Sequence, residues 1–424
     1  MAITGMMYTG LSGLTSTARS INVTGDNIAN LNTVGYRGSR AMFEDVLSRS
    51  IPGVGELGGG TTVAQIEKLF HQGPIVSSPK PEDIAISGRG FFVVAGLNDG
   101  VDGTFYTRAG NFNIDNQGYL STNGGLRVQG YAPTDGIAGS RLQDVRLERS
   151  IEPSATTRMQ MTVNFDGQTM TTTPVPFDPA NPGQTSAFSQ DTIVYDSRGT
   201  AHEVTAYFTR TGQDTWQWNL MADSDSIDGG SPTDDQTVVA RGTLTFDTSG
   251  QLTAQTVDLN GIDFENAAAD QQIEFAFDGS TNAAIGTDAE ADDSTVIALE
   301  QNGFQAGSYV GMQVTEDGTL VGRYDNGQQV TMARLAMADF ANQAGLSRAG
   351  GTLFSATRAS GEAVVGFAGA GGRGAMLGNS LEQSNVDLSE EFVKLITDQR
   401  GYQAQSRTIT TADELLTETV NLKR

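Results

Sequence analysis

The sequence predicts a mainly β protein with an α-helix at each end. Apolar residues recur every seven positions near both termini, and between them lie many short apolar runs separated by Gly, Asn and Asp. The first pattern is typical of helices that pack against other helices, and the second is typical of antiparallel strands joined by tight turns. We therefore expect paired N- and C-terminal coiled-coil helices, with nested antiparallel β-domains of the sandwich or barrel type inserted between them.

The C-terminal helix is expected to begin at Leu388. Asp387 stands directly before it and Glu390 follows three residues after Asp387, a spacing that lets both side chains cap the first turn. A repeat of seven then places apolar residues on one seam, although its second position is often polar. The seam consists of Leu388, Phe392, Leu395, Tyr402, Ile409, Leu416 and Val420. A helix with so uneven a seam is a poor lone coiled coil and needs a specific partner.

The N-terminal helix is expected to run from Thr4 to about Asn30, where asparagines and Gly35 mark its end. Its repeat consists of Met7, Leu11, Leu14, Ala18, Ile21 and Ile28. We expect the two helices to meet each other or their counterparts in neighbouring copies. Because the repeats are short, periodicity alone leaves equally open a second arrangement, in which two ordinary terminal helices pack on a globular body.

The chain is long enough for about three domains. We expect an inner helical domain of residues 1–33 and 379–424, a connector of residues 34–75, a first β-domain of residues 76–150 and 294–378, and an outer inserted β-domain of residues 151–293. Within the connector, the pattern from Ala41 to Arg49 favours a short amphipathic helix, and the glycine-rich run from Pro52 to Gly60 favours an extended or mobile segment. The run from Gly366 to Gly378 is expected to be a flexible linker.

Composition limits the classes of function. The formal charge of −24 and the pI near 4.3 argue against a nucleic-acid or anionic membrane partner, because both need basic patches. The absence of cysteine excludes disulfides, thiolate catalysis and cysteine-ligated metals. No apolar run is long enough to span a membrane, and the first residues lack the features of a cleaved secretory signal. These features predict a cytoplasmic protein or one exported with its N-terminus uncut.

No catalytic, cofactor or metal site is predicted. A Gly-x-Gly-x-x-Gly match begins at Gly369, but no βαβ unit surrounds it, so a linker is the better interpretation. His71 and His202 lie in different regions and are expected to be surface or packing residues. The acidic loop at Asp223 lacks the spacing and the terminal glutamate of an EF-hand, which favours a solvated loop.

Three long motifs resemble the bacterial flagellar axial proteins, the family of rod and hook subunits. NIANLNTVGYRGSR is similar to the N-terminal signature of the family, the stretch around SNVDLSEEF to its C-terminal signature, and DIAISGRGFFVV with the stretch up to Tyr131 to its shared β-domain. The residues that carry the likeness are Asn27, Ile28, Ala29, Asn30, Asn32, Gly35, Tyr36, Gly90, Phe91, Phe92, Arg108, Gly110, Asn385, Val386, Asp387, Gln399, Arg400 and Tyr402. Tyr36 with Arg37 departs from the more common Phe-Lys, and Lys80-Pro81-Glu82 from a more usual Pro-Leu.

The inserted region, with IVYDSRGTAH and QNGFQAGSYVGMQVTEDG, is similar to the hook branch of this family, because rod subunits are shorter and lack a second β-domain. The resemblance implies a nonenzymatic subunit without cofactors that self-assembles into a curved helical tube. Such a tube acts as a flexible joint that transmits torque from rod to filament. The alternatives are a distal rod-type subunit or, from another class, a secreted β-rich glycan-binding or hydrolytic protein.

The resemblance also implies partners and a location. The partners are further copies of the chain, the flagellar rod, the hook cap, the hook–filament junction proteins and the flagellar type III export apparatus, with no nucleic acid and no membrane. The location is the extracellular hook of the flagellar basal body, reached by export without a cleaved signal peptide.

Overall fold

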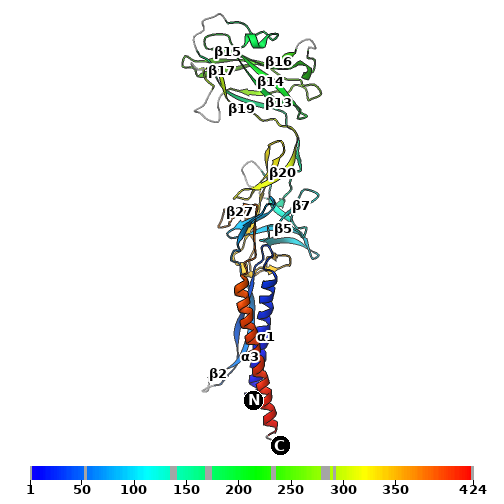
Figure 1. The fold of residues 1–424 in the computed structure, drawn as a ribbon, viewed down its shortest axis with the longest axis vertical. Coiled ribbons are helices and arrows are strands. Elements are labelled where there is room, and N and C mark those ends of the chain that lie inside the picture. The colour runs from blue at the N-terminus through cyan, green and yellow to red at the C-terminus, as the bar shows by residue number, and fades with distance from the viewer. Residues whose placement is uncertain are drawn as a thin grey trace. The chain divides into compact units, whose positions relative to one another are not determined.

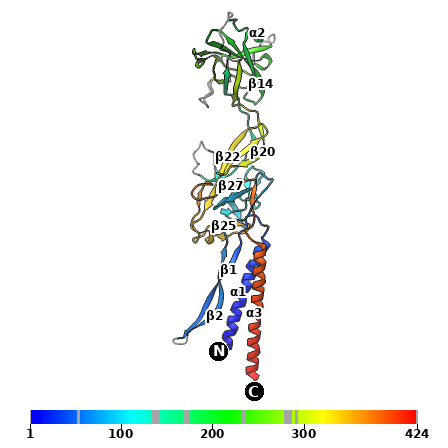
Figure 2. The ribbon, with the colours of Figure 1, turned by 60° about the vertical axis from the view of Figure 1, so that its left-hand side comes forward.

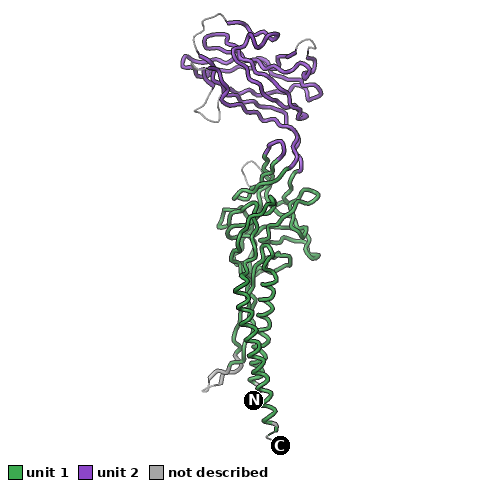
Figure 3. The backbone as a smooth tube through the Cα atoms, viewed as in Figure 1, with its two compact units in different colours: residues 1–148, 310–323, 329–424 green, residues 149–309, 324–328 purple. Residues whose placement is uncertain are grey.

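The computed structural model describes residues 2–51, 55–133, 141–167, 174–230, 235–277, 287–289 and 293–421. The chain divides into two compact units, shown in Figure 3. Unit 1 contains residues 1–148, 310–323 and 329–424, and unit 2 contains residues 149–309 and 324–328. The predicted fold class is confirmed, since strands dominate and a long helix lies at each end of the chain (Figure 1). No helix among the described residues has the length and apolar content needed to cross a membrane.

Two long antiparallel helices belong to unit 1, α1 (Ala2–Ala29) and α3 (Leu388–Asn421). The carboxylate of Asp387 accepts hydrogen bonds from the backbone N–H groups of Ser389 and Glu390, at 2.7 and 3.2 Å. These bonds satisfy two of the free N–H groups in the first turn of α3, as the sequence predicted.

A long hairpin replaces the predicted short helix and loop of the connector. It consists of β1 (Ser39–Ile51) and β2 (Gly55–Lys68), while residues 52–54 lie outside the described part. The edge of β2 is bonded to α1. Ser16 Oγ donates to the Thr61 carbonyl at 3.0 Å, and the Thr61 N–H donates to Ser12 Oγ at 3.2 Å. The helix prediction is wrong because these tertiary bonds and the strand pairing outweigh a weak local preference.

The remaining part of unit 1 is a β-domain built on one long antiparallel sheet with the path β20–β21–β22–β9–β5–β6–β25–β24. Its core contains Phe91, Tyr106, Phe340 and Phe354, whose rings meet largely edge to face. The strands are β3 (Ile75–Ser77), β4 (Ile84–Ser87), β5 (Phe91–Asn98), β6 (Val101–Thr107), β7 (Asn113–Ile114), β8 (Leu120–Ser121), β9 (Arg127–Tyr131), β10 (Gln143–Asp144), β20 (Gly307–Val314), β21 (Thr319–Tyr324), β22 (Gln329–Leu335), β23 (Met337–Asp339), β24 (Ser347–Arg348), β25 (Leu353–Ser355), β26 (Val364–Gly366), β27 (Ala375–Gly378) and β28 (Ser380–Glu382), and a 3-10 turn, η2, spans Gln343–Gly345.

The chain returns to α3 through paired strands. β27 pairs with β4 and β28 pairs with β3, both antiparallel. The predicted flexible linker is therefore wrong for β26 and β27, whose ladder hydrogen bonds fix them, and a turn joins the two strands.

Unit 2 is a β-sandwich. One sheet has the order β13–β14–β15–β16–β17 and the other β18–β12–β19, and side chains of both form a single core around Phe165, Phe208, Trp216 and Trp218. The elements are β11 (Ser150–Ile151), β12 (Arg158–Asn164), α2 (Pro182–Thr185), β13 (Phe188–Tyr195), β14 (Ala201–Arg210), β15 (Thr215–Asp223), the 3-10 turn η1 (Ser224–Ser226), β16 (Gln236–Phe246), β17 (Leu252–Asn260), β18 (Glu274–Ala276) and β19 (Thr295–Gln301).

The bounds of unit 2 differ from those predicted for the outer domain. That domain was expected to cover residues 151–293, whereas unit 2 covers residues 149–309 and 324–328, and its strand β19 pairs with β12. Charge is divided unequally: unit 2 holds 25 of the 50 acidic residues but five of the 26 basic ones, so it carries −20 of the formal charge of −24.

Candidate functional site

The contact between α1 and α3 is made by small and polar side chains. Gly10 and Gly13 let the helices approach closely, because a Cβ at Gly10 would lie 3.1 Å from Ile409 Cγ1 and one at Gly13 would lie 2.8 Å from Gln405 Cδ. Two turns further along, Ser20 donates a hydrogen bond to Asp398 at 2.7 Å. Within one chain, small and polar residues of α1 thus contact α3, and Ile409 is the predicted seam residue of α3 that takes part in these contacts.

The predicted seam residues of both helices stay partly or largely accessible in the single chain. On α1, Leu11 is 54% exposed; Met7, Leu14, Ala18, Ile21 and Ile28 are half-buried. On α3, Phe392 is 46% exposed; Leu388 and Tyr402 are also exposed, and Leu395, Ile409 and Leu416 are half-buried. The side chain of Val420 lies outside the described part. Three further apolar residues of α3 are exposed and were not predicted, because they fall off the seven-residue repeat: Val393, Ile396 and Leu415.

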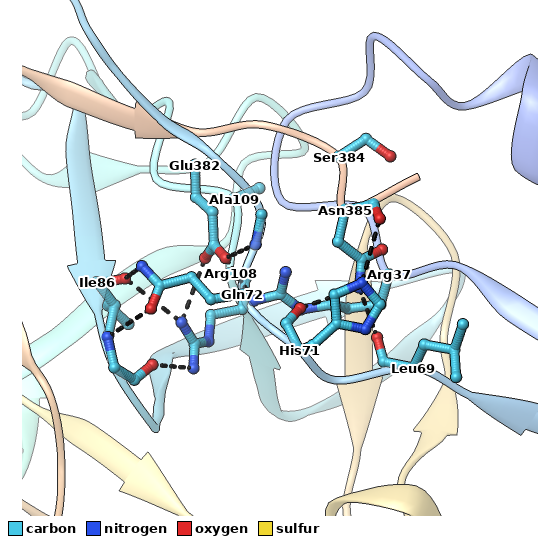
Figure 4. Close-up of polar contacts among 12 residues, drawn as sticks. Arg37, Leu69, His71, Gln72, Ile86, Arg108, Ala109, Glu382, Ser384 and Asn385 are labelled. Carbon is cyan, nitrogen blue, oxygen red and sulfur yellow. Dashed lines mark hydrogen bonds and ion pairs between the residues drawn. The ribbon is translucent and has the colours of Figure 1, made fainter. Parts of the chain in front are cut away.

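The segments that follow α1 and precede α3 meet at an ionic clasp, which we define as Arg37, Arg108 and Glu382 (Figure 4). Arg37 Nη2 donates to Glu382 Oε1 at 2.7 Å, and Arg108 Nη1 donates to Glu382 Oε2 at 3.2 Å. The side chains of Arg37 and Glu382 are fully buried and that of Arg108 is 4% exposed. Gly73 N–H also donates to Glu382 Oε1, at 2.9 Å. One carboxylate therefore joins three chain segments that are far apart in the sequence.

The clasp holds more positive than negative charge. Burial and, to a smaller degree, the neighbouring Arg37 lower the pKa of Arg108 to about 10, although Glu382 opposes both effects. In the described part of the chain, Arg37 Nε and Nη1 and Arg108 Nε have no hydrogen-bond partner. Because buried cations are costly without an anion, Glu382 is the residue on which this arrangement depends.

Asn27 and Asn385, two of the residues that carry the family resemblance, bond the ends of the helices to the chain segments beside the clasp. Asn27, on α1, makes two bonds with the Ser39 backbone: its Nδ2 donates to the carbonyl at 2.7 Å and its Oδ1 accepts from the N–H at 2.9 Å. Asn385 accepts from the Gly38 N–H at 2.8 Å and donates to the carbonyls of Leu69 and His71. Side-chain amides suit this role because each has both donors and an acceptor.

Arg348, from β24, contacts both α1 and the segment that follows it. Its guanidinium lies 5.0 Å from the centre of the Tyr36 ring and pairs with Asp26 at 3.2 Å. It also donates to the Arg37 carbonyl and to Ser39 Oγ. Burial raises the pKa of the Tyr36 hydroxyl, which donates to Asp26 at 2.9 Å. The β-domain of unit 1 is therefore bonded directly to the end of α1.

The remaining residues of the resemblance pattern divide into three groups. Gly35 and Gly110 allow close backbone approach: Gly35 has φ +67° and lies against Ala109, and Gly110 lies against the Ile84 carbonyl. The β-domain group is Gly90, Phe91 and Phe92, which are buried, and the helix group is Ile28, Ala29, Asn30, Asn32, Val386, Gln399, Arg400 and Tyr402, which are exposed or half-buried. The structure thus brings Asn27, Gly35, Tyr36, Arg108 and Asn385 together.

Arg37, Glu382 and Arg348 were not selected from the sequence as site residues. Arg37 stood inside a recognised motif, but Glu382 lies 345 positions after it, and no local pattern predicts that pair. The two histidines have structural partners: His71 Nε2 lies 3.2 Å from the Asn385 carbonyl, and His202 lies 3.1 Å from Asp196 and stacks on Phe264. Among the described residues, no three His, Cys, Asp or Glu side chains are placed to hold a metal ion.

Comparison with known proteins gives the family. Four sequence profiles match successive segments: "Flagella basal body rod protein" over residues 7–37, "Flagellar hook protein FlgE/F/G D1 domain" over 85–171, "Flagellar basal body protein FlaE D2 domain" over 164–304, and "Flagellar basal body rod FlgEFG protein C-terminal" over 377–422. The crystal structure of the Helicobacter pylori flagellar hook protein FlgE2 aligns with a TM-score of 0.51 at 15% identity, over 73% of this chain and 100% of that one, which shows a shared fold.

Full-length relatives agree with the profiles. The flagellar hook protein FlgE of Escherichia coli (strain K12) is 33% identical over 97% of this chain and 98% of its own length. Those of Treponema pallidum (strain Nichols) and Brucella suis biovar 1 (strain 1330) are 31% and 30% identical, over 99% and 100% of both chains. The chain therefore belongs to the family of bacterial flagellar hook proteins, FlgE.

Proposed function

We propose that this structural subunit of the flagellar hook polymerises by packing the apolar stripes of α1 and α3 against neighbouring copies. The observation that carries the proposal is that the residues that join the two helices within the chain differ from the apolar residues that stay exposed. Small and polar residues such as Gly10, Gly13 and Ser20 make the contact within the chain, whereas Leu11 and Phe392 remain exposed. Exposed apolar side chains in a row are costly in water, and association with further copies removes them from it.

The clasp has a mechanical role in this proposal. A joint that transmits torque needs a stiff connection between its helical layer and the β-domain outside it. Glu382, Asn385 and Arg348 supply that connection, because they bond the ends of both helices to the β-domain of unit 1. The charged hydrogen bonds of Glu382 are buried, so they are stronger than those at an exposed surface.

Unit 2 suits the outside of a bendable tube. Every subunit of a curved tube that rotates about its own axis lengthens and shortens its outer contacts once per turn. A domain with a formal charge of −20 repels its copies and keeps contacts between them hydrated, and hydrated contacts allow sliding more readily than packed apolar ones. We therefore assign the bending of the hook to contacts made by unit 2.

The finer assignments of partners and location belong to the same proposal. They are the rod, the hook cap and the hook–filament junction proteins as neighbours, and the flagellar type III apparatus as the export route. Residues near the start of the chain, such as Gly10, belong to the folded helix pair. Loss of these residues would therefore break the helix pair.

The variant Phe392→Asp tests the polymer contact. An unpaired charge buried in an apolar contact costs several kcal/mol, so we expect cells without hooks and without motility. The variant Phe392→Leu keeps the site apolar and is the matched control, for which we expect normal hooks. Because Phe392 is 46% exposed in the single chain, both purified variants should unfold at the wild-type temperature. Normal hooks made from the Asp variant would contradict the proposal.

A further inference from the structure

One face of the β1–β2 hairpin is exposed in the part of the chain that the structure describes. Phe43 pairs across the strands with Val63, and Ala41 pairs with Ile66. Phe43 is 48% and Ile66 53% exposed. Apart from Ser39, all side chains of the hairpin that the structure describes are exposed or half-buried. A two-stranded hairpin is only marginally stable by itself, so this apolar face needs a cover.

The hairpin and α3 lie against different faces of α1. Ser12 and Ser16 of α1 bond to β2, whereas Gly10 and Gly13 face α3. Figure 2 shows α1 with the hairpin on one side and α3 on the other. Both elements start beside the ionic clasp and run along α1, so they occupy the same stretch of its length. If a second copy lies beside the first, parallel to it and without a shift along α1, its α3 comes next to the hairpin of the first copy.

The exposed faces of the two elements are complementary. On α3, the exposed side chains of Phe392, Ile396 and Arg400 follow one another at every fourth position, and Arg407 continues the row two turns later. On the hairpin, Asp45 is exposed and lies two residues after Phe43, on the same face of β1. Asp45, Arg400 and Arg407 form no ion pair within the described part of the chain.

We propose that the hairpin of one copy packs against α3 of the next. The apolar pair Phe43 and Ile66 covers the apolar part of that helix around Phe392 and Ile396, and Asp45 lies opposite Arg400 and Arg407. The two surfaces differ, so the contact adds copies without closing into a dimer, as a helical polymer requires. This inference rests on the proposed function, because it names the neighbour of the exposed helix face.

Disulfide cross-linking of assembled hooks tests the contact directly. The chain contains no cysteine, so the double variant Phe43→Cys with Ile396→Cys introduces two isolated thiols. Oxidised hooks should give, on a denaturing gel without reductant, a ladder of covalent oligomers that runs beyond the dimer. Each single variant is the matched control and should show monomer. Intact hooks of the double variant that give no ladder would overturn the proposal, as would cross-links only to a different protein.

Charge reversal provides a test that does not depend on cysteine geometry. Asp45→Arg places three cations together, and we expect the number of hooks per cell to fall about tenfold or more. Adding Arg400→Glu and Arg407→Glu to the same chain should restore hooks. Reversal of two exposed acids outside this contact, Asp102→Arg with Glu362→Arg, should have no effect.

The outcomes separate this inference from the proposed function. Normal hooks from the hairpin reversal, together with lost hooks from Phe392→Asp, would overturn the hairpin contact and leave assembly through the helices intact. Normal hooks from both variants would overturn the two together. Failure of the α3 reversal to restore assembly would show that Asp45 faces something other than α3.

Discussion

The variant Glu382→Gln removes the charge of the clasp carboxylate and keeps the size of the side chain. Arg37 and Arg108 then remain buried with their positive charges, 2.7 and 3.2 Å from a neutral amide. Removing one partner of a buried ion pair costs about 3–5 kcal/mol, mostly because the other charge stays desolvated. Each kcal/mol lowers Tm by about 2–4 °C in a unit of this size, so we expect unit 1 to unfold roughly 6–20 °C lower.

Differential scanning calorimetry of the full chain measures this shift. Glu67→Gln is the matched control, because it breaks the exposed Arg40–Glu67 pair, whose side chains are 50% and 30% exposed. Exposed pairs contribute about 0–1 kcal/mol, so the control should unfold close to the wild-type temperature. If Glu382→Gln lowered Tm no more than Glu67→Gln does, the clasp would not hold unit 1 together.

Three further predictions concern the helices and unit 2. A chain without residues 1–26 and 388–424 keeps the clasp and should be a folded monomer by analytical ultracentrifugation; tubes formed by it would contradict the role of the helices. Burial raises the pKa of Asp196, but hydrogen bonds from the Thr200 backbone and His202 outweigh burial and hold that pKa below its ordinary value of 3.8. The carboxylate therefore stabilises unit 2 above that pH, and this stability is lost as the pH falls toward the folded-state pKa, so Asp196→Asn should flatten the acid dependence of unfolding. Deletion of unit 2 should leave tubes that are straighter than wild-type hooks. The curvature of wild-type hooks should change with salt concentration, because salt screens the negative charge of unit 2. Electron micrographs that show the same curvature with and without unit 2, and at low and high salt, would refute this.

The terminal helices and the β-rich middle were predictable because their signals are local. A seven-residue repeat and a capping aspartate at Asp387 suffice for α3, and short apolar runs between turn residues suffice for the strands. The contact between the helices was not predictable in the same way. A heptad analysis gives weight to apolar residues, whereas Gly10 and Gly13 make the close approach. The assignment of the apolar seam to contacts between copies stays a prediction, as does the separation of an inner helical domain from the first β-domain.

The hairpin and the clasp depend on contacts that no local pattern reveals. Glycines around Gly58 favour a loop in any local analysis, yet hydroxyl groups of α1 and the partner strand hold this segment extended. The clasp joins Arg37 to Glu382 over 345 positions and Arg108 to Glu382 over 274 positions. Only the folded chain shows that one carboxylate serves both arginines.

A cryo-EM map of isolated hooks at side-chain resolution tests the central claim most directly. The account predicts that α1 and α3 form the inner layer of the tube and that Leu11 and Phe392 of each copy are covered by helices of neighbouring copies. It also predicts that Gly10 and Gly13 still face α3 of their own chain. Apolar stripes that face the channel or bulk water in the assembled hook, with neighbouring copies joined through unit 2 instead, would contradict it.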